Sequence, residues 1–419
     1  MAKIKIPRNI RFVLDKLDKA GYEAWCVGGC VRDSLLGREP KDWDITTNAK
    51  PEKIKEVFKD YTIIDNNGEK HGTVTVRYND ENIEITTYRV DGEYVDSRHP
   101  ESVSFTEDIE EDLARRDFTI NAIAGNVAVE DDVDCIIDPF EGVADLHKGI
   151  IRAVGNPEDR FEEDALRILR GIRFACRYNF NIDFKTKLAM LNKKDKLKNI
   201  SKERILTEIK EIFNYHKIGD LMQDTMINII ICDLIPEFKT LNAKVFSLFE
   251  NNAFITNFAG LLSLIPEYNV EEILNRFGFS KVERKKLLLL SIFSKCKYNF
   301  TDSEMIVKIM HIFIDQHHYT KEDAYYMVRD LIEIQNKFLL VPEAYNKDYE
   351  YNSVETLNKT VKERCICIKD LAINGNDLVE MQYKGEEIGE ILQQIFKHVS
   401  NGTLKNDKET LIYYAIKIA

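Results

Sequence analysis

The sequence has no long hydrophobic run. No stretch reaches about eighteen consecutive apolar residues, the length that a helix needs to cross a bilayer. The opening segment, MAKIKIPRNIRFVLDKLDKAGY, has the charged pattern of an amphipathic helix and lacks the apolar core of a signal peptide. We therefore expect no transmembrane helix, no secretory leader and no membrane partner.

The sequence also lacks a pairing pattern among its cysteines. Its 8 cysteines are scattered, and none belongs to a C-x-x-C pair. Neither a structural zinc site nor a disulfide framework is indicated. Free thiols of this kind fit a reducing compartment, so we expect a cytoplasmic protein.

Positive charge is not in excess. The chain has 59 Lys and Arg against 71 Asp and Glu, a net charge of −12, which argues against indiscriminate binding to nucleic acid. One segment, 185–217, is locally basic and fits a solvated helical face as well as a surface that follows phosphates. Its basic residues are Lys185, Lys187, Lys193, Lys194, Lys196, Lys198, Lys202, Arg204, Lys210 and Lys217.

The most informative pattern lies at residues 26–47, CVGGCVRDSLLGREPKDWDITT. A short apolar strand leads into Gly28 and Gly29, and a helix is predicted directly after them. Glycine has no Cβ, so the backbone can approach a ligand closely, and the free N–H groups of a helix start suit a phosphate. Arg32 would add guanidinium donors. A Gly-Gly pair by itself usually marks only a turn.

Two carboxylates follow in the same stretch. Asp42 and Asp44 are spaced i, i+2, so on a strand both side chains would point to one face. Hard oxygen ligands in that arrangement suit Mg²⁺. By itself, a D-x-D pair is more often a solvated strand end or a cap.

The combination is more specific than its parts. G-G-x-V-R-D followed by D-x-D resembles the signature of polymerase β superfamily nucleotidyltransferases, and more closely that of the tRNA nucleotidyltransferase and bacterial poly(A) polymerase family. RRDFTINA at 115–122 is similar to a further motif of this family, and DPFEGVADL at 138–146 to its hinge motif. The resemblance implies that Gly29, Arg32 and Arg116 hold the phosphates and sugar of a nucleotide. A structural salt bridge is the alternative for Arg116.

Three strands are predicted after residue 60, and the last two of them are expected to form a hairpin around Asn79-Asp80. On the last strand, Glu84 is either a third carboxylate near Asp42 and Asp44 or a polar residue that faces solvent. The predicted strands are 61–65, 72–78 and 82–89.

Residues 90–108 lack periodicity and are rich in charge, so a long loop is predicted, and such loops in compact domains are functional or disordered. Family members that complete the whole tRNA tail have a flexible loop at this place. The resemblance implies that Asp96 and Arg98 are its polar groups.

From Pro157 to Tyr178 the pattern predicts one helix, capped by Asn156. Polar residues at a spacing of three form a slanted stripe on it, which alone would be read as an exposed salt-bridge ladder. The stripe consists of Asp164, Arg167, Arg170 and Arg173.

The beginning of this stripe resembles the E-D-x-x-R element of class II CCA-adding enzymes, in which Asp and Arg pair with the base of the incoming nucleotide. Asp164 accepts hydrogen bonds and Arg167 donates them. The amino groups of cytosine and adenine would satisfy Asp164, whereas uracil and guanine present a carbonyl there. Arg170 and Arg173 would hold the triphosphate or stack nearby.

We expect an α+β protein. A nucleotidyltransferase head with a small mixed sheet would occupy residues 1–150, and an all-α part would follow. The helical part would consist of a neck that recognises the base (151–205), a body (206–300) and a tail that binds tRNA (301–419).

The resemblance covers nearly the whole chain and implies an enzyme that adds C, C and A to the tRNA 3′ end from CTP and ATP without a template. Two Mg²⁺ ions on Asp42 and Asp44 would activate the 3′-hydroxyl and stabilise the leaving pyrophosphate. The tail and the basic segment would dock the acceptor stem and elbow of tRNA.

Narrower activities stay open, namely addition of CC only, of A only, or of a poly(A) tail. The loop at 90–108 favours full CCA addition over CC addition, but it does not separate full addition from A addition. An inactive RNA-binding protein is a hypothesis of a different class, and the intact motif carboxylates and arginines argue against it. The sequence does not indicate an oligomeric state.

Overall fold

The computed structural model describes residues 4–64, 72–92, 103–127, 134–251, 253–339 and 347–418. Contacts within the chain divide it into two compact units, Met1–Asn251 and Asn252–Ala419. Each unit is described separately. The finer division into head, neck, body and tail stays a prediction.

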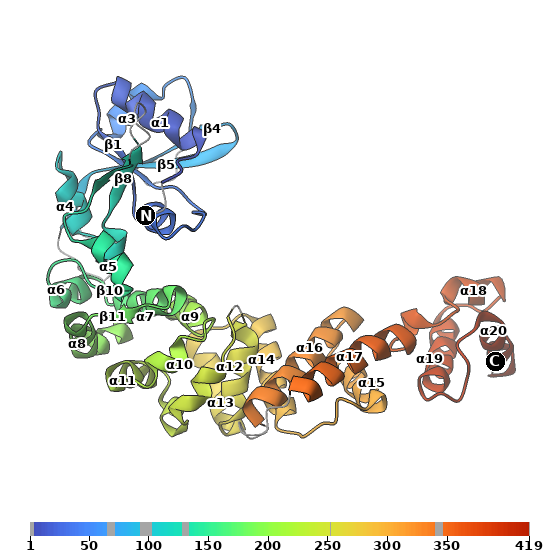
Figure 1. The fold of residues 1–419 in the computed structure, drawn as a ribbon. Coiled ribbons are helices and arrows are strands. Elements are labelled where there is room, and N and C mark those ends of the chain that lie inside the picture. The colour runs from blue at the N-terminus through green and yellow to red at the C-terminus, as the bar shows by residue number, and fades with distance from the viewer. Residues whose placement is uncertain are drawn as a thin grey trace. The chain divides into compact units, whose positions relative to one another are not determined.

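The first unit contains a mixed sheet, which among the described residues has seven strands in the order β3-β4-β5-β2-β1-β8-β9 (Figure 1). β2 and β5 run parallel, and the other neighbours are antiparallel. This sheet confirms the predicted α+β class. The strands are β1 (Ala24–Val27), β2 (Ile45–Thr47), β3 (Thr62–Ile64), β4 (Thr73–Tyr78), β5 (Glu81–Thr87), β8 (Ala124–Val127) and β9 (Asp134–Ile137).

The β4–β5 hairpin forms where the sequence predicts it. Asn79 and Asp80 both have positive φ, 48° and 64°, as a two-residue hairpin turn requires. Side chains on β5 alternate between the two faces, so that Ile83 and Ile85 are buried while Glu84 is exposed. Glu84 therefore lies on the face opposite the apolar core.

Three helices accompany the sheet, namely α1 (Arg8–Lys19), α2 (Gly29–Leu35) and α3 (Pro51–Val57). The apolar stripe of α1 is buried as predicted, through Ile10, Val13, Leu14 and Leu17. α1 contacts β1 and α3, and α3 contacts β4 and β5, so both helices pack against the sheet.

The predicted loop over 90–108 is wrong at its ends, where β6 (Arg89–Asp91) and β7 (Val103–Phe105) form an antiparallel ribbon. Backbone pairing of two short segments overrides the absence of a side-chain pattern. α4 (Ile109–Ala114) follows, capped by the carboxylate of Asp108. Asp96 and Arg98 lie outside the described residues, and their role stays a prediction.

The hinge motif contains a helix, α5 (Gly142–Lys148), between β9 and β10 (Ile150–Ile151). The carboxylate of Asp138 accepts hydrogen bonds from the first two N–H groups of this helix, Gly142 and Val143, and so starts it. A Cβ on Gly142 would lie 2.1 Å from the carbonyl oxygen of Thr119. The hinge therefore packs directly against η2 (Thr119–Asn121) of the RRDFTINA motif.

The predicted single helix from Pro157 to Tyr178 is wrong, because it breaks into α6 (Pro157–Glu163) and α7 (Leu166–Tyr178). Asn156 caps α6 as expected. At the break Asp164 has an extended backbone, and its carboxylate accepts the N–H of Leu166 at 2.9 Å. A new helix cap at Asp164 thus competes with helix continuation.

The rest of the first unit is mainly helical, and α6 packs on α8 while α7 packs on α9 (Figure 1). The elements are β11 (Asn181–Ile182), α8 (Phe184–Lys193), η3 (Lys194–Asn199), α9 (Lys202–Ile212), α10 (Ile218–Leu221), α11 (Thr225–Leu234), η4 (Pro236–Thr240) and η5 (Ala243–Leu248).

The second unit is helical throughout its described residues. It begins with α12 (Phe254–Ser263), α13 (Glu267–Phe277), α14 (Lys281–Ser294), α15 (Ser303–His311), the π-helix η6 (Ile312–Gln316), α16 (Lys321–Ile334) and the π-helix η7 (Gln335–Leu339). It continues with α17 (Lys347–Glu363), η9 (Ile368–Asp370), α18 (Gly375–Glu380), α19 (Glu386–Ser400) and α20 (Lys408–Ile418). In the part of the chain that the structure describes, no helix has both the length and the apolar character needed to span a bilayer.

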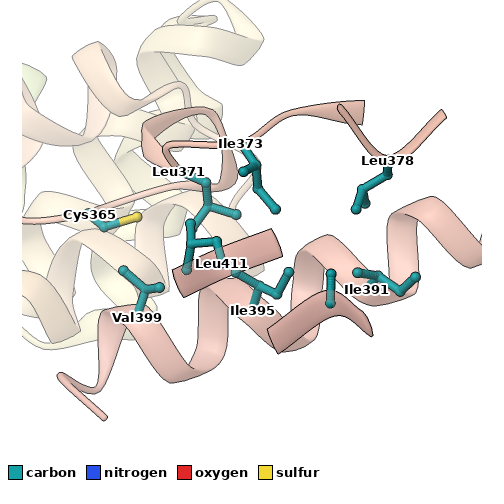
Figure 2. Packing of buried hydrophobic residues seen from close by; sticks show 9 residues of the cluster. Cys365, Leu371, Ile373, Leu378, Ile391, Ile395, Val399 and Leu411 are labelled. Carbon is teal, nitrogen blue, oxygen red and sulfur yellow. The ribbon is translucent and has the colours of Figure 1, made fainter. Parts of the chain in front are cut away.

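A small core in this unit, shown in Figure 2, is formed by α18, α19, α20 and the segment 365–373. Leu378, Ile395 and Leu411 are fully buried in it, and Cys365 lies at its edge. A capping box at Asn374 and Asp377 starts α18. These residues therefore have structural roles.

Candidate functional site

The two glycines lie directly against two arginines. Gly28 has φ of 78°, which favours glycine, and a Cβ there would lie 2.9 Å from Nη1 of Arg116. A Cβ on Gly29 would lie 3.5 Å from Nη2 of Arg32. The missing Cβ of Gly28 thus makes room for the Arg116 guanidinium, whereas the distance at Gly29 is an ordinary van der Waals contact.

Arg32 is buried, and its guanidinium contacts several protein side chains. Its Nε binds Asp33 at 2.9 Å and its Nη1 binds the side chain of Asn121. Its guanidinium also lies over the rings of Phe174 and Tyr178, at 5.4 and 4.8 Å. Arg32 therefore joins the glycine turn to α7, and only part of its donor set is left for a ligand.

Asp42 and Asp44 lie on the segment just before β2 rather than on a strand, so the predicted strand position is wrong. The carbonyl of Asp44 accepts the N–H of Val27 at 3.0 Å, which places Asp44 beside the end of β1. Both aspartates line a cleft of about 1360 Å³. Their side chains are exposed and make no hydrogen bond or ion pair with any residue that the structure describes.

The electrostatics of Asp44 link the carboxylate pair to the glycine turn. Desolvation by the surrounding protein raises the pKa of its carboxyl, Arg116 opposes this, and Asp42 adds to it. The two aspartates therefore repel each other, and a bound cation would relieve that repulsion.

Glu84 lines the same cleft. It precedes Ile85, which pairs with Ile45 in the parallel β2–β5 ladder, so Glu84 on β5 lies level with Asp44, the residue directly before β2. Within the described ranges, however, no three His, Cys, Asp or Glu side chains are arranged to hold a metal ion. Both interpretations of Glu84 stay open.

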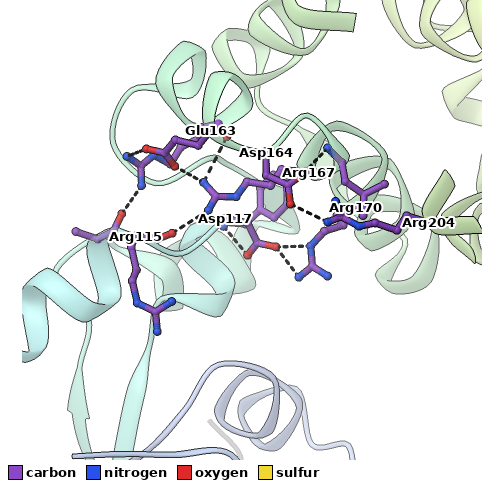
Figure 3. Close-up of polar contacts among 11 residues, drawn as sticks. Arg115, Asp117, Glu163, Asp164, Arg167, Arg170 and Arg204 are labelled. Atoms are coloured by element: carbon purple, nitrogen blue, oxygen red, sulfur yellow. Dashed lines mark hydrogen bonds and ion pairs between the residues drawn. The ribbon is translucent and has the colours of Figure 1, made fainter. Parts of the chain in front are cut away.

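Asp117, in the RRDFTINA motif, binds residues of both α7 and η2 (Figure 3). It binds Nε of Arg170 at 2.8 Å and the amide of Asn121 at 3.0 Å. Burial opposes its charge, but Arg170, Asn121 and Arg167 lower the pKa of the Asp117 carboxyl to about 2. Asp117 therefore links α7 to η2 through its two carboxylate oxygens.

A second group of polar contacts lies at the break between α6 and α7 (Figure 3). Oδ2 of Asp164 accepts from Arg204 on α9 at 3.0 Å. Arg167 donates to Glu163 at 2.6 Å and to the carbonyl of Arg115 at 3.2 Å. Asp164 and Arg167 are thus each held by a partner outside the predicted stripe.

Arg170 and Arg173 are both engaged inside the protein. Arg173 lies 3.1 Å from Glu208 on α9, and Arg170 binds Asp117. Both guanidiniums also lie over the ring of Phe174. These contacts favour a supporting role over direct contact with a triphosphate.

The basic segment 185–217 is largely neutralised. Lys187 binds Asp224, Lys193 and Lys196 bind Glu162, and Lys198 binds Asp195. Lys185 and Lys202 are exposed and form no ion pair. Most of this segment is therefore an ion-paired helical surface.

Sequence reasoning missed Arg204 and the central role of Asp117. Arg204 is 40 residues from Asp164, and a contact at that separation leaves no periodic signal. Asp117 shows no pattern in the sequence that indicates its contacts with Arg170 and Asn121, which are 53 and 4 residues away.

Comparison with known proteins supports a common origin over the whole chain. Residues 24–152 match the family described as "Poly A polymerase head domain", and 265–415 match "tRNA nucleotidyltransferase domain 2 putative". Residues 179–226, which include the whole basic segment, match "Probable RNA and SrmB- binding site of polymerase A".

Individual relatives cover nearly all of the chain. The CCA-adding enzyme of Ligilactobacillus salivarius is 34% identical, and the match covers 97% of this chain and 95% of the relative. That of Staphylococcus saprophyticus is 33% identical, with 95% of each chain covered. The crystal structure of the Bacillus stearothermophilus CCA-adding enzyme in complex with CTP is similar with a TM-score of 0.73, 27% identity, and 99% and 98% of the two chains covered.

Proposed function

Because the chain belongs to the class II CCA-adding enzymes, a family of nucleotidyltransferases, we propose that it adds C, C and A to the 3′ end of tRNA, from CTP and ATP and without a nucleic-acid template. The observation that carries this proposal is the position of Arg116. Its Nη1 lies 2.9 Å from the place where a Cβ on Gly28 would be, and its positive charge opposes the rise in the pKa of the Asp44 carboxyl, so this one cation is close to the turn and acts on one carboxylate of the pair.

The donors present fit Mg²⁺. Asp42 and Asp44 offer hard oxygen atoms that are free of protein partners and repel each other in one cleft. Mg²⁺ in such enzymes needs only one or two carboxylates, because water and substrate phosphates complete its coordination. When bound, two Mg²⁺ ions would activate the tRNA 3′-hydroxyl and stabilise the leaving pyrophosphate.

The chain itself positions the nucleotide. Gly28 and Gly29 let the phosphates approach the backbone, and Arg116 meets their negative charge. Arg32, held by Asn121 and the α7 aromatics, fixes the turn and has its Nη2 next to Gly29. Catalysis then rests on alignment and charge neutralisation, which act strongly in a preorganised site.

Base choice is assigned to Asp164 and Arg167. Arg204 and the Leu166 N–H hold Asp164 from two sides, which keeps its carboxylate oriented and acceptor-only. The amino group of cytosine or adenine can donate to it, whereas uracil and guanine would place a carbonyl there. That mismatch costs about 1–3 kcal/mol for each unpaired buried group.

The tRNA partner is assigned to the helical part of the chain. The family match at 179–226 includes an RNA-binding description, and the second unit matches a tRNA nucleotidyltransferase domain. Since most of the basic segment is ion-paired, docking of the acceptor stem and elbow would depend more on shape than on a dense positive surface.

The test is nucleotide incorporation into three tRNAs that end before CCA, after C and after CC, each with CTP, ATP or both and with Mg²⁺. Two C and then one A support the proposal. Addition of A alone to the CC-ending tRNA would make this an A-adding enzyme, and C alone would make it a CC-adding one. Long A runs on unrelated RNA would indicate a poly(A) polymerase, and no incorporation would favour an RNA-binding protein.

A further inference from the structure

Asp112 is a buried carboxylate next to the site that the proposed mechanism does not use. It lies on α4, and its side chain is 0% exposed. Its Oδ1 accepts from the Arg89 N–H at 3.3 Å and from Nε of Arg115 at 3.0 Å. Its Oδ2 accepts from the Thr46 hydroxyl at 3.3 Å and from Nη2 of Arg116 at 3.4 Å.

These contacts join three parts of the fold at one carboxylate. Thr46 belongs to β2 and follows Asp44 by two residues, and Arg89 begins the ribbon at the base of the predicted loop. Burial alone would disfavour a charge at Asp112, but the nearby guanidiniums of Arg115 and Arg116 lower the pKa of its carboxyl. Asp112 is therefore an ionised group enclosed by the protein.

Arg116 connects this buried charge to the glycine turn. Its Nη2 faces Asp112, whereas its Nη1 lies at the place where Gly28 has no Cβ. The Nε of Arg116 is buried and has no hydrogen-bond partner among the described residues, and the hydrogen bond to Asp112 orients the guanidinium on the protein side. Its charge also acts on Asp44.

We propose that Asp112 is a positioning residue for nucleotide transfer, which holds the Arg116 guanidinium against Gly28 so that it faces the phosphates of the bound CTP or ATP. This inference rests on the proposed function, because it assumes that Arg116 meets those phosphates. Asp112 is enclosed on every side and acts only through Arg116. It also restrains Arg116 relative to β2, the strand that follows the carboxylate pair.

The test is a double-mutant cycle of Asp112→Asn and Arg116→Gln, with kcat and KM for CTP measured on a tRNA that ends before CCA. We expect Arg116→Gln to lower kcat/KM by about 10²-fold and Asp112→Asn by about 10-fold, and the double variant to match Arg116→Gln within about 3-fold. Thermal unfolding of each variant is measured in parallel.

The matched control is Asp145→Asn. Asp145 is also a buried aspartate of the first unit that binds a threonine hydroxyl and an arginine, Thr119 and Arg152, but it does not contact Arg116. Its loss in kcat/KM should multiply with that of Arg116→Gln. If Asp112→Asn does not fold, Thr46→Val removes a hydroxyl that lies 3.3 Å from the same carboxylate and 3.2 Å from the carbonyl oxygen of Thr86. The part of its loss that acts through Asp112 should vanish in the Arg116→Gln background.

The outcomes separate the two proposals. Losses of Asp112→Asn and Arg116→Gln that multiply, as those of the control do, would overturn the positioning role and leave the function of Arg116 intact. Normal kcat/KM in Arg116→Gln would instead remove the assigned role of Arg116, and the inference about Asp112 with it.

Discussion

The cleft that Asp42 and Asp44 line and the junction of α6 and α7 both contain charged side chains, but these side chains differ in the protein contacts that they make. In the cleft, Asp42 and Asp44 have exposed side chains that make no hydrogen bond or ion pair with the described residues. At the junction, Asp164 is held by Arg204, and Arg167 is held by Glu163 and the Arg115 carbonyl. Groups that would bind a metal ion are left open, whereas groups that would select a base are fixed before the base arrives.

The largest loss of activity should come from a substitution in the cleft that Asp42 and Asp44 line. Asp42→Ala should lower nucleotide incorporation by at least about 10³-fold, because it removes one of the two carboxylates proposed to hold the metal ions. Its thermal stability should stay within about 0.5 kcal/mol of the unchanged protein, since Asp42 makes no contact that folding needs. Incorporation kinetics and a tRNA binding assay check this, and normal turnover would contradict the metal assignment.

The glycine turn should be almost as sensitive. Gly28→Ala combines a strained positive φ with a methyl group 2.9 Å from Arg116, so we expect a loss of about 10²-fold in kcat/KM for CTP. Gly21→Ala is the matched control, because Gly21 has φ of 84° but nothing within 4 Å of a Cβ. Both variants should lose about 1 kcal/mol of stability from backbone strain. Equal loss of activity in the two would show that strain alone is responsible.

Changes at the junction of α6 and α7 should alter the preference between nucleotides more than the rate of incorporation. Arg204→Gln frees one oxygen of Asp164, so the preference for CTP over UTP should fall by about 10-fold while kcat for CTP changes less. Arg276→Gln, which breaks an exposed ion pair with Glu272 in the second unit, serves as the control. An unchanged preference for CTP in Arg204→Gln would contradict the claim that Arg204 orients Asp164 for base selection.

The smallest effect concerns acid stability. Folding lowers the pKa of Asp117 to about 2, so its stabilisation is present above about pH 4 and is lost as the pH falls towards 2. Asp117→Asn should therefore flatten the decrease in unfolding free energy over this range, by roughly 2 kcal/mol. Denaturant unfolding at several pH values measures it, and an unchanged slope would show that Asp117 is not ionised as described.

Local patterns predicted the open region well. The Gly-Gly turn, the hairpin at Asn79-Asp80 and the stripe of α1 depend on residues close in sequence, and the structure has all three. The Asp42 and Asp44 pair was also found from spacing, although it precedes β2 instead of lying on it.

The fixed region was predicted less well, because its contacts join distant residues. The helix break at Asp164 depends on a cap that competes with helix continuation, and periodicity continues through it. The partnership of Arg204 with Asp164 and the contacts of Asp112 with Thr46 and Arg89 cross 23 to 66 residues. Such pairs are visible only once the chain is folded.

The most direct test of the account is single-turnover incorporation of CTP, ATP, UTP and GTP by Asp42→Ala and Asp164→Ala, on a tRNA that ends before CCA, together with nucleotide binding. The account predicts that Asp42→Ala loses incorporation of every nucleotide but still binds CTP more tightly than UTP. It predicts that Asp164→Ala still incorporates nucleotides but no longer prefers CTP over UTP. An Asp164→Ala variant with unchanged preference would contradict the assignment of base choice to the junction of α6 and α7.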